Sequence, residues 1–128
     1  MDLRIIDIRR RVAREGLASP DDIDAIDDIL EAEGGSVELL ILRGQLIQLV
    51  ANGRPDELEE AFACYQEAIE LDPDSAEAHE EIGHFLDGVA DEPGEAVPFF
   101  RKAIELGAGA SAREGLRDVL SQLGREEP

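Results

Sequence analysis

AFACYQEAIEL, at residues 61–71, recurs 35 residues later as AVPFFRKAIEL at residues 96–106. The two copies share an alanine, an aromatic residue and a second alanine at i, i+4 and i+7, which lie on one stripe of a helix. Two methyl groups and one ring in such a stripe indicate a helix that packs closely against a neighbour. A repeat of this length is typical of arrays built from identical supersecondary units.

Helix start and stop signals divide the rest of the chain. Ser19 followed by Pro20 marks one helix start, Ser36 and Ser111 are further candidate N-caps, and Gly34 marks an end. The first segment is the least sharply defined, because residues 3–5 would also suit a short strand. Short loops favour antiparallel hairpins and an all-α fold. About seven helices are predicted, near residues 3–16, 20–33, 37–51, 55–71, 75–88, 94–106 and 112–123.

Length and composition limit the class of protein. A chain of 128 residues is predicted to form a single domain, residues 1–128. No run of 18 apolar residues occurs, so we expect no membrane-spanning helix, and the acidic start does not resemble a signal peptide. Cys64 is the single cysteine, which excludes an internal disulfide and a cysteine-based metal site. We therefore expect a cytoplasmic protein.

The charge balance is strongly acidic. The formal net charge is −19, from 31 acids and 12 basic residues, although residues 1–18 alone are basic. Nucleic acid and anionic membranes are disfavoured as partners, because both require basic surface. Two interpretations stay open: a self-repelling surface typical of an acid-rich proteome, and a concave acidic face that attracts a cationic segment.

The repeat resembles the tetratricopeptide repeat, a helix–turn–helix unit of 34 residues. That family carries Trp-x2-Leu-Gly-x2-Tyr in the first helix and Ala-x3-Phe-x2-Ala-x4-Pro across the second. The matching residues here are Gly44, Ala61, Tyr65, Ala68 and Pro73, then Ile82, Gly83, Leu86, Ala96, Phe100 and Ala103. The tryptophan place holds Leu40, His79 and Arg113. The resemblance implies an all-α, short right-handed superhelical array of antiparallel helix hairpins.

The same resemblance implies an organisation into units. Residues 36–73 and 74–108 would each form a unit, and residues 109–124 a C-terminal capping helix with Leu116 and Leu120 in packing places. Residues 1–35 resemble a degenerate N-terminal helix pair. Because each unit buries its apolar face only against its neighbours, so short an array depends on its end units.

Several patterns approach a catalytic or metal site without completing one. HEEIGH at residues 79–84 is close to the His-Glu-x-x-His zinc motif, but its histidines are separated by about 140° around a helix. Glu80, His84 and Asp87 share a helix face that would suit a weak metal site or a solvated polar surface. Cys64 has no catalytic base beside it, and no Gly-rich phosphate loop occurs. We predict no catalytic residue, no metal and no cofactor, and hence no enzyme.

Function is therefore expected to reside in a surface. In tetratricopeptide proteins the first helices of successive units line a concave groove that holds a peptide. The resemblance places these residues in the groove: Ile41, Gln45, Gln48, Glu77, Glu80, His84, Asp87, Glu114 and Asp118. The family's best-known groove clamps a carboxylate with Lys, Arg and Asn, whereas acids and glutamines stand here. We predict a protein-interaction scaffold or adaptor that binds a basic or amphipathic segment bearing Lys or Arg.

An alternative function rests on the Arg-rich first segment, which carries Arg4, Arg9, Arg10, Arg11 and Arg14. It predicts a structural subunit that self-associates, or docks in a larger assembly, through this helix. The simpler interpretation is a terminal helix that packs on the first hairpin and neutralises local acids. A monomer is the default expectation.

Overall fold

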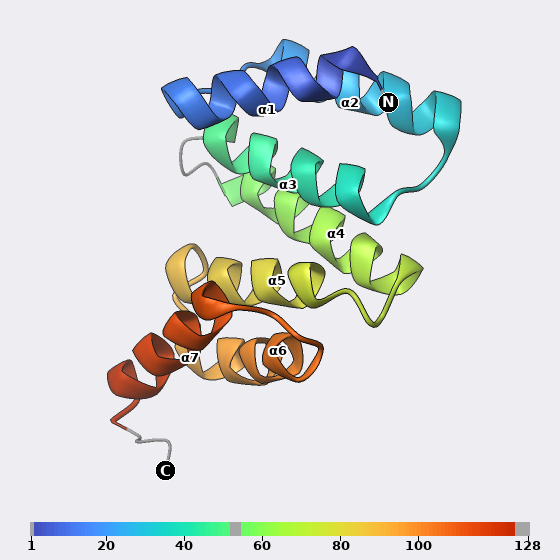
Figure 1. The fold of residues 1–128 in the computed structure, drawn as a ribbon. Coiled ribbons are helices and arrows are strands. Elements are labelled where there is room, and N and C mark those ends of the chain that lie inside the picture. Colours follow the sequence, from blue (N-terminus) through green and yellow to red (C-terminus); the bar gives the residue numbers. More distant parts are fainter. Residues whose placement is uncertain (1, 52–54, 125–128) are drawn as a thin grey trace.

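The computed structural model describes residues 2–51 and 55–124, and these form seven α-helices and no strand (Figure 1). Each helix contacts the next one along the chain, and α5 also contacts α3 and α7. The all-α array is confirmed, and residues 3–5 are helical. The helices are α1 (Leu3–Glu15), α2 (Pro20–Glu33), α3 (Val37–Ala51), α4 (Pro55–Leu71), α5 (Ala76–Gly88), α6 (Pro93–Glu105) and α7 (Ala110–Gln122).

Local signals account for most of the helix ends. The Asp2 side chain accepts a hydrogen bond from the Arg4 N–H at the start of α1, and Gly16 ends that helix in a left-handed conformation. The Ser75 side chain accepts from the Ala78 N–H at the start of α5. Ser111 is not the N-cap that we expected, because α7 begins at Ala110 after Gly109. Its hydroxyl is therefore free to face α5.

The core consists of two clusters that meet at α3. A smaller cluster joins α1, α2 and α3 around Ile8, Ile26 and Leu46, and a larger one extends from α3 to α7 around Tyr65 and Phe100. Helix α3 contributes buried side chains to both clusters, so it is covered on opposite sides. This explains why its sequence is apolar around most of its circumference.

Glycines let the large aromatic rings pack against helix backbones. A Cβ atom at Gly44 would lie 2.5 Å from Tyr65 Cε1, and one at Gly83 would lie 2.8 Å from Phe100 Cε1. Gly115 of α7 meets Phe100 from the other side, with a corresponding distance of 2.5 Å. Tyr65 and Phe100 thus fill space that a side chain at these glycines would occupy. The role of Gly115 was not predicted from the sequence.

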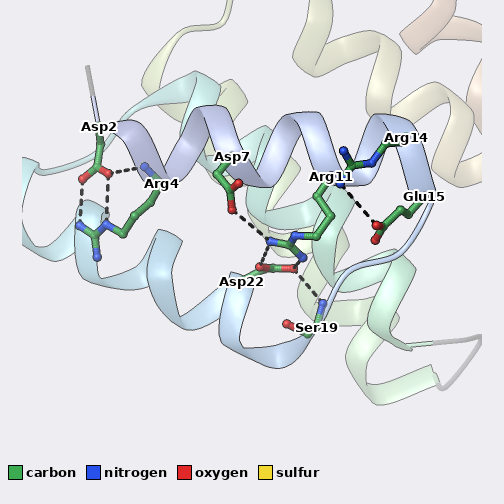
Figure 2. A network of polar contacts seen from close by, with 8 residues as sticks. All are labelled: Asp2, Arg4, Asp7, Arg11, Arg14, Glu15, Ser19 and Asp22. Carbon is green, nitrogen blue, oxygen red and sulfur yellow. Dashed lines mark hydrogen bonds and ion pairs between the residues drawn. The ribbon is translucent and has the colours of Figure 1, made fainter.

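A buried carboxylate joins the first two helices. Arg11 of α1 donates two hydrogen bonds to Asp22 of α2, at 2.9 and 2.7 Å, and the Ser19 N–H donates a third at 2.9 Å (Figure 2). Asp22 is 6 % exposed. Asp7 lies 3.9 Å from Arg11 and is largely solvent-exposed. The hydrogen bonds from Arg11 and Ser19 lower the pKa of Asp22, against the opposing effect of burial.

This pair should make stability depend on pH. Because the folded pKa of Asp22 is lowered, its contribution is present above the unfolded pKa of about 3.9 and is lost as the pH falls through the folded value. We expect Asp22→Asn to destabilise the protein at pH 7, and the difference from wild type to shrink as the pH falls below about 4. Urea denaturation across this range measures it. Asp7→Asn is the matched control, and an equal effect of both substitutions would contradict the assignment.

Candidate protein-interaction face

Polar side chains bridge the helices α3, α5 and α7 on one side of the array. The Gln45 side-chain amide of α3 donates to Glu81 Oε1 of α5 at 2.9 Å. His84 Nε2 of α5 lies 3.1 Å from Ser111 Oγ of α7, and Gln122 of α7 donates to Asp87 of α5 at 2.8 Å. These contacts show that the three helices present a common polar surface.

Helix periodicity assigns further side chains to this surface. Ser111 and Gln122 of α7 both face α5, and Glu114 and Asp118 lie on the same stripe at i+3 and i+7 from Ser111. Glu77 shares a stripe of α5 with Glu80, His84 and Asp87, and Gln48 follows Gln45 on α3. We call the whole set the acidic face: Gln45, Gln48, Glu77, Glu80, Glu81, His84, Asp87, Glu114 and Asp118. It contains six carboxylates and no Lys or Arg.

The predicted groove residues differ in accessibility. Glu77, Glu114 and Asp118 are exposed, whereas Gln45, Gln48, Glu80, His84 and Asp87 are half-buried. Ile41 is 2 % exposed and belongs to the larger core cluster, so it cannot contact a partner in this conformation. The resemblance to tetratricopeptide proteins placed Ile41 in the groove, and this assignment is wrong because neighbouring side chains cover Ile41.

The two histidines have separate partners. His79 Nε2 donates to the Pro73 carbonyl at 2.9 Å and its ring packs against Phe99, whereas His84 Nε2 lies 3.3 Å from Glu80 Oε2. Within residues 2–51 and 55–124, no group of three or more His, Cys, Asp or Glu side chains is arranged to hold a metal ion. The described side chains therefore provide no metal centre on which to build a mechanism.

Most of the N-terminal arginines have partners close by. Arg4 pairs with Asp2, Arg11 with Asp22 and Arg14 with Glu15 (Figure 2). This arrangement agrees with a terminal helix that neutralises local acids. Arg9 and Arg10 are exposed. Because Arg4 and Arg14 are exposed as well, α1 still presents positive charge to solvent, and docking through this helix stays a prediction.

Sequence reasoning missed one residue of the acidic face, Glu81. Glu81 was not assigned a role, and Tyr65 was assigned to packing alone. The Tyr65 hydroxyl is buried and has no hydrogen-bond partner among the described residues. Burial raises the pKa of Glu81, although the hydrogen bond from Gln45 opposes this effect. The available signal was the position of Glu81 four residues after Glu77, on the same side of α5.

A second missed residue, Arg43, links three helices. Its guanidinium donates to Asp27 of α2, to Glu60 of α4 at 2.8 Å and to Cys64 Sγ at 3.1 Å. Burial raises the pKa of Cys64, and Arg43 only partly offsets that rise. Cys64 is thus held as a buried thiol within a structural network and not as an activated nucleophile.

Comparison with known proteins identifies the repeat. Residues 56–88 match a family model described as the TPR repeat. The chain contains a tetratricopeptide repeat. The matched range spans α4 and α5, whereas the units expected from the sequence pair α3 with α4 and α5 with α6. The match therefore establishes the type of repeat and leaves the unit boundaries as a prediction.

A solved structure resembles the helical array over nearly its whole length. The crystal structure of PilW, described as a widely conserved type IV pilus biogenesis factor, matches with a TM-score of 0.72 at 22 % sequence identity. The match covers 95 % of this chain and 52 % of PilW, so this chain spans about half the length of that protein. No curated protein matches the chain. The likeness to PilW supports the fold.

The described helices also bear on the expected relation to membranes. None of them combines the length and the apolar character that crossing a bilayer requires.

Proposed function

We propose that this protein is a non-catalytic interaction scaffold that holds a Lys- or Arg-bearing protein segment against the acidic face. Tetratricopeptide arrays serve generally as protein-interaction scaffolds. The acidic face is the polar surface shared by α3, α5 and α7, the first helices of the predicted units. The observation that carries the proposal is the group of six carboxylates on α5 and α7, which side-chain hydrogen bonds join to each other's helices and to Gln45 of α3.

Electrostatics favour a cationic partner for this surface. The net charge of −19 attracts positive segments over a distance set by the ionic strength, and raises the rate at which they associate. Half-buried carboxylates such as Glu80 are less screened than exposed ones, so they contribute more to specificity. Ile41 is excluded from this proposal because it is buried.

Charge reversal on two helices tests the proposal. We expect the double variant Glu80→Lys with Glu114→Lys to bind a fluorescent amphipathic Lys-Leu-Ala peptide about 5- to 30-fold more weakly than wild type. The reason is that two attractive contacts become repulsive. The salt dependence of binding should also become flatter. Fluorescence anisotropy at low and high salt measures both effects.

A matched control separates the face from the total charge. Glu31→Lys with Glu70→Lys changes the net charge equally at exposed positions on α2 and α4. If this control weakens peptide binding as much as Glu80→Lys with Glu114→Lys does, binding depends on the overall charge and the acidic face is not the binding site.

A further inference from the structure

His84 lies where α5 and α7 meet on the acidic face. Its Nε2 atom is 3.1 Å from Ser111 Oγ of α7 and 3.3 Å from Oε2 of Glu80, one turn earlier on α5. The imidazole meets the buried Phe100 ring edge-on, with centroids 4.9 Å apart, and this contact restrains its position. The His84 side chain is 40 % exposed, so the ring exchanges protons with solvent.

A single nitrogen atom thus faces two groups with different hydrogen-bonding requirements. The ionised Glu80 carboxylate can only accept, whereas the Ser111 hydroxyl can also donate. When the neutral ring carries its hydrogen on Nδ1, Nε2 accepts from Ser111 and gives no hydrogen bond to Glu80. When the ring is protonated, Nε2 carries a hydrogen, and a charged N–H bonds more strongly to a carboxylate than to a hydroxyl.

Carboxylates are the charged groups that face His84 among the described residues. They belong to α5 and α7: Glu77, Glu80, Glu81, Asp87, Glu114 and Asp118. Arg113 and Arg117 of α7 lie about 200° and 240° around the helix from Ser111, so they point away from His84. Helix α6 meets the imidazole with an aromatic ring, and α3 presents an uncharged glutamine to α5. Glu80 is therefore the carboxylate with which a protonated His84 pairs.

We propose that His84 is a proton-controlled switch that sets the affinity of the acidic face for its cationic partner. The neutral ring accepts from Ser111, and Glu80 is then available to a lysine or arginine of the bound segment. A proton taken from solvent binds Nε2, after which the ring donates to Glu80 and the Ser111 hydroxyl turns to water. The new positive charge also repels the partner. This inference rests on the proposed binding at the acidic face and adds its regulation by pH.

Binding of the fluorescent Lys-Leu-Ala peptide at two pH values and fixed ionic strength tests the switch. Histidine titrates between about pH 7.5 and about pH 5.5, whereas ordinary carboxylates and the lysines of an end-capped peptide do not. Wild type should bind the peptide about 3- to 10-fold more weakly at the lower pH. His84→Gln cannot gain a proton, so its affinity should change less than about 2-fold.

Matched controls cover the other groups that titrate near this range. His79 is the second of two histidines in the chain, and it packs against Phe99. His79→Gln should therefore keep the pH dependence. Burial raises the pKa of Glu81, so Glu81→Gln should weaken binding at both pH values and keep their ratio. Loss of the pH dependence in His79→Gln or in Glu81→Gln would overturn the assignment to His84.

Ser111→Ala separates an exchange of hydrogen bonds from a simple gain of charge. Without the hydroxyl the neutral His84 ring loses its donor, so the ring should take up a proton more easily. The midpoint of its titration should move up by about half a pH unit, and the midpoint for peptide affinity should follow. Nuclear magnetic resonance of the histidine ring protons measures the first midpoint without peptide. An unchanged midpoint would mean that charge alone acts, and would overturn the switch.

The outcomes distinguish this proposal from the proposed function. If wild type binds the peptide equally at both pH values, the switch is wrong and the acidic face stands as the proposed binding surface. If no cationic peptide binds at either pH, the proposed function is wrong and the switch has no binding to control.

Discussion

Phe100→Ala is expected to lower the free energy of unfolding by about 3–5 kcal/mol. The Phe100 ring is 0 % exposed and lies between Gly83 of α5 and Gly115 of α7, with the His84 ring edge-on at 4.9 Å. Glycines contribute no side chain that could move into the space, so the cavity cannot close easily. Since α7 contacts only α5 and α6 among the described helices, its attachment should be lost first.

Urea denaturation followed by circular dichroism measures this effect. Phe99→Ala is the matched control, because the neighbouring Phe99 is half-buried and packs at the edge of the cluster. Its cost should be clearly smaller. A loss of less than about 1.5 kcal/mol for Phe100→Ala would mean that the end of the array rearranges to fill the cavity.

Gly44→Ala and Gly88→Ala should have opposite effects on stability. Alanine favours a helix over glycine by about 0.5–1 kcal/mol, and both residues lie in helices. At Gly44 the new methyl group would collide with the buried Tyr65 ring, so we expect a net loss of about 1–3 kcal/mol. At Gly88 a Cβ atom meets nothing within 4 Å, so we expect a gain of up to about 1 kcal/mol.

Thermal and urea midpoints of the two variants provide the comparison. Each substitution adds the same methyl group, so the difference between them reports packing alone. A neutral or stabilising result at Gly44 would contradict the close approach of Tyr65 to the backbone of α3.

Much of the fold was predictable because its signals are local. Ser75 and Gly16 cap their helices through contacts within four residues, and the alanine and aromatic stripe of residues 61–71 lies within one helix. The tetratricopeptide resemblance also located the close packing at Gly83. It did not locate Gly115, because the capping helix follows the family pattern only loosely.

The candidate site was less predictable because accessibility depends on neighbouring helices. The i, i+4, i+7 stripe of α3 includes both Ile41 and Gln45, yet the first is in the core and the second is half-buried. The hydrogen bond from Gln45 to Glu81 joins residues 36 apart in the sequence, which a pattern within one helix cannot show.

The sequence by itself determined the helical periodicity, the repeat, the acidic charge and most of the helix ends, because each depends on residues close together in the chain. Only the tertiary structure decided which polar groups are buried and how they are paired. Arg11 meets Asp22, Arg43 joins Asp27 to Glu60, and Gln45 meets Glu81. These pairings depend on how helices remote in sequence pack together, and burial then sets how strongly each charge acts.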